Sequence, residues 1–570
     1  MTVAVGLPFL FEDKLYNCAA YCCNGHVIAL VPKSNIPSYG EYSETRWFAS
    51  GEKIIGREVL FGEDIVPFGI DVLVKDELHG VTIGTELGED LFVPDKPSTH
   101  AALAGANVIV NLSASNEVIK KEEYRLESVK HQSENCYCAY IYTSSGMDES
   151  STDLVFSGHT IIAEDGKVLA NHIFPERSHV EYAIIDLDKV DYNRMMHNTF
   201  LSNDNAWYRL GITTVHPLAS RDEITASQLA AALKKENYPV MRMPLVPADD
   251  AERERRCARI IQIQAHGLAT RVRATNIKTL VLGVSGGLDS TLALLVCNEA
   301  KKIVPDIRII GYTLPSEGNT SDDTKKNAWA LMKALKIDAR ELAIGKEVKD
   351  HLVLIGHGPN YLGDSDTTYE NAQARMRTYI LMDIANMENG LVVGTGDLSE
   401  LALGWCTYNG DQMSMYGVNA SIPKTLVQYL CYNYALTCGD KKLKDVLLRI
   451  VDTPISPELT PNHKGKIAQK TEDKIGKYDL NDFFMFYIMR YGLTPDKILG
   501  LALTAYPELT KEHIKEAEIR FYKRFFYQQF KRSCSPDGPK VGTITLSPRG
   551  DWHMPSDATV DLWLDILKKA

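Results

Sequence analysis

The sequence predicts an α/β protein in which a strand-rich half precedes a doubly wound parallel sheet. Residues 1 to about 190 alternate short apolar runs with Gly and Asn turns, a pattern typical of strands. Beyond residue 248, three apolar runs are each followed by polar loop residues and a helical pattern, which indicates parallel strands joined by helices. The 570 residues are too many for one core, so we expect at least two domains.

The first half contains five short apolar runs that predict strands, at residues 27–31, 81–85, 108–112, 139–142 and 160–163. Cys136 and Cys138 precede the fourth run, and alternation places both on one face of a strand. Core packing explains this pair better than metal binding, and we predict no zinc site. We expect this domain to span residues 1–190, followed by a polar, proline-containing connecting segment at 191–247.

The second domain is expected to span residues 248–570. Its apolar runs at 280–284, 308–313 and 391–395 predict strands of one parallel sheet. In such sheets, ligands bind beyond the carboxyl ends of the strands. The loops that follow these three runs are therefore predicted to line a single site.

The loop Ser285-Gly-Gly-Leu-Asp-Ser290 is the most informative of the three. Gly286 and Gly287 let backbone N–H groups approach an anion, and Ser285 and Ser290 add hydroxyl donors at a helix start. A capped glycine turn would explain only part of this pattern. Asp289, beside such a phosphate cradle, is a natural ligand for Mg²⁺. The loop is neither a Walker A motif nor a dinucleotide fingerprint.

The segment 394–400 follows the third strand of this sheet. It places Thr395, Asp397 and Glu400 at a strand end, where Glu400 can join Asp289 around magnesium. Helix capping by Asp397 or Ser399 is an alternative that is compatible with this interpretation.

The segment 369–377 predicts a helix with Asn371 and Arg375 on one face. Its arginines suit phosphates, and surface salt bridges would explain them equally well.

Charge and composition exclude several classes of function. The net charge of −12 argues against a nucleic-acid partner. No apolar stretch has the length of a membrane helix, and the N-terminus lacks the basic start of a signal peptide, so we expect a cytoplasmic protein without a membrane partner. Eleven cysteines, an odd number, indicate reduced thiols rather than a disulfide framework.

The loop at 285–290 resembles that of the ATP pyrophosphatase superfamily, whose members adenylate a substrate oxygen and release pyrophosphate. From about residue 2 to the C-terminus, the chain is similar to NAD⁺ synthetases of the long, glutamine-dependent type. The motifs that carry this resemblance in the second half are Ser285–Ser290, residues 369–377 and 394–405, Asn419-Ala-Ser-Ile-Pro-Lys-Thr425, Gln469-Lys-Thr-Glu472 and Gln529-Phe-Lys-Arg-Ser533. The resemblance implies that ATP is a substrate, with Mg²⁺, and that deamido-NAD⁺ is amidated to NAD⁺ through an adenylate.

The resemblance also implies roles for individual residues. ATP would be held by Gly283, Val284, Ser285, Gly286, Gly287, Leu288, Asp289, Ser290 and Thr395. Deamido-NAD⁺ would be held by Asn371, Glu400, Trp405 and Lys531, with Asp411 and Lys424 as further contacts. Trp405 offers an aromatic face to the nicotinate ring, and Lys531 offers a positive charge to phosphates or to the adenylate. Asp289 and Glu400 would bind the metal.

The first half resembles the nitrilase-like glutaminase domain of this family. The resemblance rests on Leu15-Tyr-Asn-Cys18, residues 32–41, Asn111-Leu-Ser-Ala-Ser115 and Phe156-Ser-Gly-His159. The fold it implies is a truncated nitrilase-like α/β sandwich followed by a doubly wound, parallel-sheet ATP pyrophosphatase domain. Lys33 matches the lysine of the family's Glu-Lys-Cys triad, and Tyr39, Ser115 and Lys121 match positions that contact glutamine.

Two members of the triad fail to match. Gly88 stands where the family has its cysteine, and the chain begins after the segment that would carry the glutamate. Loss of such a nucleophile lowers turnover on the order of 10⁶-fold. We therefore expect an inactive glutaminase half, ammonia as the nitrogen donor, and a homo-oligomer that covers the exposed edges of a truncated domain.

Three other interpretations stay open. The chain could use glutamine fully, if Gly88 and the start of the chain are sequence errors. It could be another adenylating pyrophosphatase that amidates a purine nucleotide or thiolates tRNA. Thirdly, it could be a nucleotide-binding scaffold without catalysis, against which the retained Glu400 and Lys531 argue.

Overall fold

The computed structural model describes residues 1–146, 154–175, 179–200, 224–316, 322–357, 366–453, 475–550 and 552–570, together with the backbone of 211–215. The chain divides into two compact units. Unit 1 comprises Met1–Val240 with Tyr491–Leu493, and unit 2 comprises Met241–Arg490 with Thr494–Ala570. The division falls inside the segment 191–247 that the sequence predicts as a connector.

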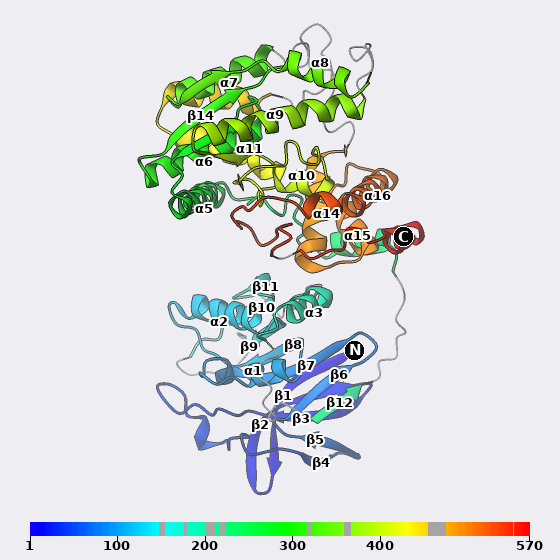
Figure 1. Cartoon of the computed structure of the whole chain (residues 1–570). Helices are drawn as coiled ribbons and strands as arrows, with labels where there is room; N and C mark the ends of the chain where they lie inside the picture. Colours follow the sequence, from blue (N-terminus) through cyan, green and yellow to red (C-terminus); the bar gives the residue numbers. More distant parts are fainter. Residues whose placement is uncertain are drawn as a thin grey trace. The chain divides into compact units, whose positions relative to one another are not determined.

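Unit 1 is built mainly from strands. Its strands are β1 (Thr2–Phe11), β2 (Lys14–Cys23), β3 (His26–Pro32), β4 (Arg57–Phe61), β5 (Asp64–Phe68), β6 (Val72–Asp76), β7 (Val81–Leu87), β8 (Val108–Ser113), β9 (Ala139–Ser144), β10 (Thr160–Glu164), β11 (Lys167–His172) and β12 (Gly211–Val215). Its helices are η1 (Glu44–Arg46), η2 (Gly88–Leu91), α1 (Pro97–Leu103), α2 (Lys121–Asn135), α3 (Leu187–Met196) and α4 (Ala226–Lys235). Figure 1 shows this unit in blue to cyan.

The strands of unit 1 form two sheets. One has the order β1-β2-β3-β5-β4, and the other has the order β11-β10-β9-β8-β7-β6-β12. In the second sheet β7, β8 and β9 run parallel, so their carboxyl ends meet at one edge. The loop after β7 contains Gly88, and the loop after β8 contains Ser115. The sheet therefore brings two residues of the predicted glutaminase site to the same edge.

Three hydrophobic clusters make unit 1 a layered sandwich. Side chains of β2 and β3 pack against β6 between the two sheets, through Tyr21, Val31, Val72 and Val74 among others. The other face of the seven-stranded sheet packs against α1 and α2. The other face of the five-stranded sheet has its own cluster around Phe68. Alternation along the strands explains these separate faces, because successive side chains point to opposite sides.

All five strands predicted for the first half are present, and the fold class is confirmed. Two expectations were wrong. Cys136 is not on a strand, because α2 continues to Asn135 and Cys136 is its C-terminal cap, followed by Tyr137 with a positive φ of 42°. The predicted connecting segment is also more than a connector, since its residues 211–215 form β12, which pairs in parallel with β6.

Unit 2 alternates strands and helices before a helical C-terminal part. Its strands are β13 (Thr279–Gly283), β14 (Arg308–Thr313), β15 (Asp338–Glu341), β16 (Gly390–Gly394) and β17 (Tyr416–Gly417). Its helices are α5 (Asp250–Thr275), α6 (Leu288–Ile303), α7 (Asp322–Ala334), α8 (Gly345–Leu354), α9 (Thr367–Met387), α10 (Leu398–Leu403), α11 (Lys424–Thr437), α12 (Lys441–Val451), α14 (Tyr478–Tyr491), α15 (Pro495–Ala505), α16 (Lys511–Tyr527), α17 (Gln529–Arg532) and α18 (Asp561–Lys569).

The sheet of unit 2 is entirely parallel and has the order β15-β14-β13-β16-β17. The chain passes from β13 outward to β14 and β15, and then returns to place β16 on the other side of β13. The strand order therefore reverses between β13 and β16. Ligands of doubly wound sheets bind at such a switch point, and both predicted phosphate-side loops lie there.

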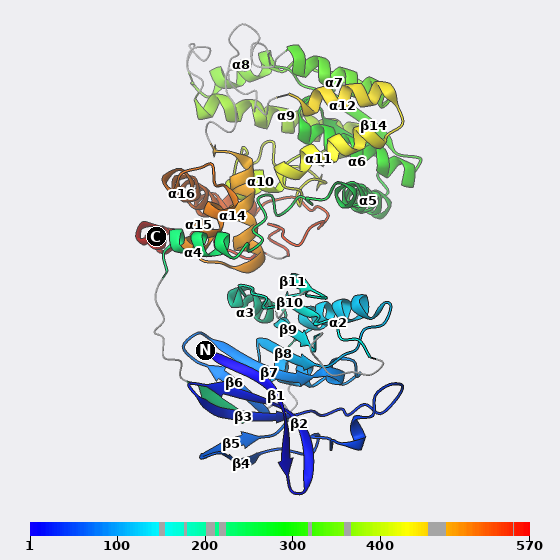
Figure 2. The same ribbon diagram turned by 180° about the vertical axis from the view of Figure 1, so that it is seen from behind.

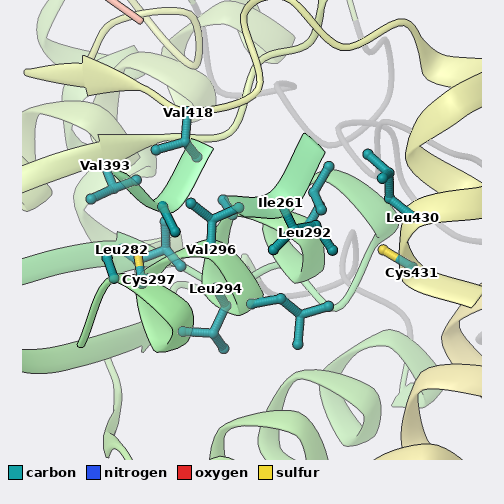
Figure 3. Close-up of a cluster of buried hydrophobic side chains, with 14 of the residues drawn as sticks. Ile261, Leu282, Leu292, Leu294, Val296, Cys297, Val393, Val418, Leu430 and Cys431 are labelled. Atoms are coloured by element: carbon teal, nitrogen blue, oxygen red, sulfur yellow. The ribbon is translucent and has the colours of Figure 1, made fainter. Parts of the chain in front are cut away.

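Helices cover both faces of this sheet, as Figures 1 and 2 show from opposite sides. On one face α5, α6, α7, α11 and α12 pack against Leu280, Leu282 and Val393. Figure 3 shows part of this cluster, including Leu292 and Val296 of α6. On the other face α8 and α9 pack against Val281, Ile310 and Val392. No helix among the described residues is long and apolar enough to cross a membrane.

We predict that Gly84→Ala destabilises unit 1, because β7 lies very close to its neighbours at this residue. An added Cβ would lie 2.5 Å from Ala101 Cβ and 2.9 Å from Ile109 Cδ1. Overpacking of this kind costs about 1–3 kcal/mol. Gly6→Ala on β1 is the matched control, since nothing lies within 4 Å of its added Cβ. Urea unfolding followed by circular dichroism should give a lower unfolding midpoint for Gly84→Ala than for Gly6→Ala. Equal midpoints for the two variants would contradict the prediction.

Candidate active site

The loop between β13 and α6 is shaped by its own serines. Ser285 Oγ lies 3.1 Å from Ser290 Oγ and accepts a hydrogen bond from the Gly287 N–H at 3.2 Å. Ser290 Oγ in turn accepts from the Ser285 N–H at 3.2 Å. Gly287 precedes the first residue of α6, so the loop ends at the positive end of a helix dipole. The predicted ATP-binding residues 283–290 thus run from the end of β13 through this loop into the first turn of α6, a place suited to an anion.

Gly286 is required by close contact with a neighbouring helix. Its φ is +89°, and an added Cβ would lie 2.2 Å from the carbonyl oxygen of Thr324 on α7. Both the backbone conformation and the lack of space exclude a side chain at Gly286.

The loop after β16 is joined to the loop after β13 by the buried side chain of Asn419. Its Nδ2 donates to the carbonyl oxygens of Asp289 at 2.9 Å and of Thr395 at 3.1 Å.

A capping box starts α10 directly after β16. Asp397 Oδ1 accepts from the Glu400 N–H at 2.8 Å, and Glu400 Oε2 accepts from the Asp397 N–H at 3.3 Å. Both predicted interpretations of this segment therefore apply at once: Asp397 caps α10, and Glu400 faces the loop that follows β13.

Lys424, the first residue of α11, lies among three carboxylates. Its Nζ is 2.7 Å from Asp289 Oδ2, 2.6 Å from Asp397 Oδ2 and 3.0 Å from Glu400 Oε1. The lysine side chain is only 2% exposed. Three carboxyl groups thus surround one ammonium, and we call these four residues the carboxylate–lysine cluster.

Burial and mutual repulsion change the proton affinities within this cluster. Burial raises the pKa of Glu400 to about 7, with Lys424 opposing and Asp289 reinforcing the shift. Burial likewise raises the pKa of Asp397 well above its usual value, and Glu400 adds to that effect. The three carboxylates raise the pKa of Lys424 although burial opposes them, so the ammonium stays charged.

The cluster also fits a divalent cation. Oxygen atoms of Asp289, Asp397 and Glu400 all lie within 4.8 Å of one another, and carboxylates are the ligands that Mg²⁺ prefers. Asp289 Oδ1 is buried without a hydrogen-bond partner, which leaves an acceptor for a cation. Asp289 and Glu400 were predicted as ligands. Asp397 was predicted only as a cap, because its approach to Asp289 depends on the adjacency of β13 and β16.

A second set of polar residues holds the start of α11. Pro423, which precedes the helix, offers no side-chain cap. Instead Ser399 Oγ of α10 accepts from the Lys424 N–H at 2.8 Å, and Asp482 Oδ2 of α14 accepts from Thr425 Oγ1 at 2.7 Å. Asp482 also accepts from the Thr425 N–H at 3.2 Å and from the Ser399 hydroxyl. These contacts fix the backbone of Lys424 independently of its carboxylate partners.

The residues predicted to hold deamido-NAD⁺ converge on the segment 404–411 that follows α10. Asn371 Oδ1 accepts from Thr407 Oγ1 at 2.8 Å. Lys531 Nζ donates to the carbonyl oxygens of Gly404 at 2.9 Å and Cys406 at 2.7 Å. The Lys531 ammonium therefore holds the backbone on either side of Trp405.

Arginines support the same region. The Arg524 guanidinium lies 5.3 Å from the centre of the Trp405 ring, and its Nε donates to the Leu403 carbonyl. The fully buried Arg532 donates to the carbonyls of Leu401 and Ala402 at the end of α10. On α9, Arg375 and Arg377 also donate to backbone carbonyls, those of Tyr408 and Leu314. The sequence suggested phosphates or surface salt bridges as partners of these arginines, and did not predict hydrogen bonds to backbone carbonyls.

A small pocket is lined by Asp397 and Glu400 of the carboxylate–lysine cluster together with Cys406 and Asp411. Burial raises the pKa of Asp411, whose Oδ1 accepts from the Thr407 N–H at 2.6 Å. The lining of this pocket is therefore acidic. The predicted motif at residues 469–472 lies outside the described residues.

In unit 1, Gly88 and Lys33 face each other. A Cβ added to Gly88 would lie 3.6 Å from Lys33 Nζ and 3.6 Å from Ser113 Oγ, with φ at +50°. The position that the resemblance assigns to a cysteine is therefore next to the matching lysine, and it holds no side chain. Lys33 Nζ donates to both carboxylate oxygens of Glu44, at 2.8 and 2.7 Å. Sequence reasoning missed Glu44, which belongs to no motif and begins the short helix η1.

Each of the predicted glutamine contacts makes a hydrogen bond to another side chain of unit 1. Tyr39 donates to Glu89 Oε1 at 2.7 Å, and this bond raises the pKa of Tyr39 to about 12. Lys121 Nζ donates to Tyr42 Oη at 2.6 Å, and the rings of Tyr39 and Tyr42 are 5.6 Å apart. Ser115, at the same strand edge, accepts from Arg125 at 3.4 Å.

Comparison with known proteins gives one consistent family. A family model described as NAD synthase matches residues 260–524. The chain is 40% identical to a glutamine-dependent NAD(+) synthetase of Mycobacterium tuberculosis, over 99% of this chain and 85% of that protein. It is 39% identical to the protein of the same name from Mycobacterium leprae, over 100% of this chain and 86% of that one. A solved glutamine-dependent NAD(+) synthetase from Cytophaga hutchinsonii matches 100% of this chain and 86% of its own, with 19% identity and a TM-score of 0.43.

We predict that Gly286→Ala disrupts the loop after β13. The left-handed backbone and the 2.2 Å approach to Thr324 both oppose a Cβ, at a combined cost of about 2–5 kcal/mol. Gly287→Ala is the control, because its φ of −88° is ordinary and its Cβ meets only Ser285 Oγ at 3.4 Å. Thermal unfolding should show a lower midpoint for the first variant alone.

We predict that Glu86 makes unit 1 less stable as the pH rises. Burial raises its pKa from 4.5 to about 7, against hydrogen bonds from Ser98 and Tyr140. The folded state therefore holds this proton more tightly than the unfolded state. The resulting stability, about 3 kcal/mol, is present below pH 4.5 and is lost as the pH rises to about 7. Glu86→Gln should flatten this dependence in urea titrations between pH 4.5 and 8, and an unchanged slope would contradict the assignment.

Proposed function

The chain belongs to the family of glutamine-dependent NAD(+) synthetases, and from that premise we propose that it forms NAD⁺ from deamido-NAD⁺, ATP and ammonia. In the first step an oxygen of the nicotinate carboxylate attacks the α-phosphorus of ATP, and the bond to pyrophosphate breaks. In the second step ammonia attacks the activated carbonyl carbon, AMP leaves, and a proton is lost from nitrogen. The products are NAD⁺, AMP and pyrophosphate.

The observation that carries this proposal is the meeting of an anion-binding loop with the carboxylate–lysine cluster. The glycine turn at residues 285–287 and the start of α6 suit ATP phosphates. Magnesium held by Asp289, Asp397 and Glu400 would neutralise phosphate charge during transfer. The Lys424 ammonium lies at the same point and supplies a positive charge to the phosphates or to the leaving group.

The acceptor substrate is proposed to lie along the segment 404–411. Trp405 is partly exposed and offers a ring face to nicotinate, while Arg524 occupies a position 5.3 Å from the ring centre. Lys531 supports the backbone on both sides of Trp405, so its contribution includes placing that ring. Asn371 holds the same segment through Thr407. Glu400 lines the same small pocket as Cys406 and Asp411 of this segment.

Ammonia is proposed as the nitrogen donor because unit 1 lacks a nucleophile at the required place. Gly88 carries no thiol, and Cys18 and Cys23 are buried in separate hydrophobic clusters, on opposite faces of the five-stranded sheet. Burial raises the pKa of the Cys18 thiol to about 12, which opposes thiolate formation. The relatives are named glutamine-dependent, which favours glutamine as the second candidate donor.

We predict that the purified chain forms NAD⁺ with ATP, magnesium, deamido-NAD⁺ and ammonium, and forms at least about 10³-fold less with glutamine at equal concentration, since a missing nucleophile abolishes amide hydrolysis. Product would be measured by an NAD⁺-specific dehydrogenase assay. Equal rates with both donors would overturn the assignment of ammonia. No product with either donor would overturn the proposed function.

We predict that Gly88→Cys introduces a reactive thiol. Its Cβ would lie 3.6 Å from Lys33 Nζ, and a neighbouring ammonium lowers the pKa of a thiol. Labelling with iodoacetamide at pH 7 followed by peptide mass spectrometry should modify the introduced thiol faster than the buried native thiols. Gly88→Ser is the control for the strained backbone, since it carries a side chain without a thiol. Labelling of the introduced thiol no faster than that of Cys18 would contradict the geometry.

A further inference from the structure

We propose that Lys424 is an exchangeable internal counter-ion: its ammonium holds the carboxylates of Asp289, Asp397 and Glu400 together before substrate binds, and leaves them when a divalent cation arrives. This inference rests on the proposed function, because it concerns the same site.

The contacts of Lys424 lead directly to this exchange. Its Nζ lies within 3.0 Å of one oxygen from each of the three carboxylates. The same three residues are those whose oxygens lie within 4.8 Å of one another. The ammonium therefore occupies the oxygens of Asp397 and Glu400 that the capping box leaves open, while Asp289 Oδ1 has no partner. A lysine and a divalent cation compete for those oxygens, because their charges repel at such short distance.

The surroundings of Lys424 explain why a positive charge is needed at this position. Three carboxylates in a largely buried site would repel one another without a cation between them. Glu400 and Asp289 are 20% and 25% exposed, and Asp397 is fully buried. The ammonium therefore keeps the loops after β13 and β16 in the arrangement that the metal needs.

The backbone of Lys424 is secured by other residues. Ser399 accepts from its N–H, and Asp482 accepts from the N–H and hydroxyl of Thr425. Neither Ser399 nor Asp482 belongs to the set of carboxylates around the ammonium. The lysine can therefore change its side-chain position while the start of α11 stays in place. Released from the carboxylates, the ammonium becomes available to the phosphates of ATP, which carry the opposite charge.

The test is metal binding without nucleotide. Mn²⁺ affinity of the full chain would be measured by electron paramagnetic resonance for wild type and for Lys424→Met, which keeps the length of the stem. Removing the competing ammonium should lower the Kd for Mn²⁺ by at least about tenfold, the scale expected for one close charge. An unchanged or weaker affinity would overturn the proposal.

Lys531→Met is the matched control, since it removes a partly buried ammonium that contacts carbonyls of the same unit and no carboxylate of the cluster. Its Mn²⁺ affinity should stay within about twofold of wild type, because this ammonium does not compete with the cation for a carboxylate oxygen of the cluster. A tenfold change there would show a general charge effect and would count against the proposal.

A crystal structure of the wild-type chain with Mn²⁺ tests the same proposal if the variant fails to fold. The Lys424 Nζ should then lie beyond hydrogen-bond distance of Asp289 Oδ2, and an unbroken contact would overturn the exchange. The NAD⁺ assay distinguishes failure of the exchange from failure of the proposed function. Tighter Mn²⁺ binding by Lys424→Met without NAD⁺ formation by wild type would support the exchange and reject the synthetase assignment. NAD⁺ formation by wild type with unchanged Mn²⁺ binding by Lys424→Met would support the synthetase assignment and reject the exchange.

Discussion

The burial of one ammonium among three carboxylates is the constraint on which the site of unit 2 depends. Lys424, Asp289, Asp397 and Glu400 come from the starts of three helices, and none of them could be buried alone without a large cost. Their mutual compensation requires β13 and β16 to be neighbours, so that the loops that follow these strands meet. The charge balance of the site therefore depends on the strand order of the sheet.

Hydrogen bonds from more distant elements make this arrangement rigid. Asn419 joins the loop of β13 to that of β16, and Asp482 joins α14 to the starts of α10 and α11. Both side chains are buried, and Asp482 supplies a partner to the Thr425 N–H, one of the backbone groups that the start of α11 leaves unsatisfied. Beyond α10, cationic side chains of α16 and α17 do the same for the carbonyls of residues 401–406. The C-terminal helices thus position the segment that carries Trp405.

Under the proposed function, unit 1 keeps the geometry of an amidase site that lacks its reactive atom. Gly88 has the left-handed backbone and the short distance to Lys33 that a reactive side chain would need there. Strained backbone of this kind is costly for any residue except glycine, and it is commonly retained at functional turns. Glu44 accepts hydrogen bonds from the Lys33 ammonium with both carboxylate oxygens, so the two charges are paired within the chain. Under this proposal, unit 1 is therefore an amidase-like scaffold without a nucleophile.

The sequence by itself determined the elements whose signals are local. The strands β13, β14 and β16, the glycine–serine loop, and the pairing of Asp289 with Glu400 could be predicted, because apolar runs, turn residues and strand-end polarity are properties of short segments. Cys136 shows the limit of such reasoning, since alternation suggested a strand where packing extends α2 instead. Only the tertiary structure decided that Asp397 joins the carboxylates that could bind a metal, that Lys424 lies among them, that Lys531 supports the backbone beside Trp405, and that Glu44 pairs with Lys33. The physical reason is the same in each case: these contacts join residues that are between 11 and 135 positions apart, and their partners are chosen by which strands and helices become neighbours.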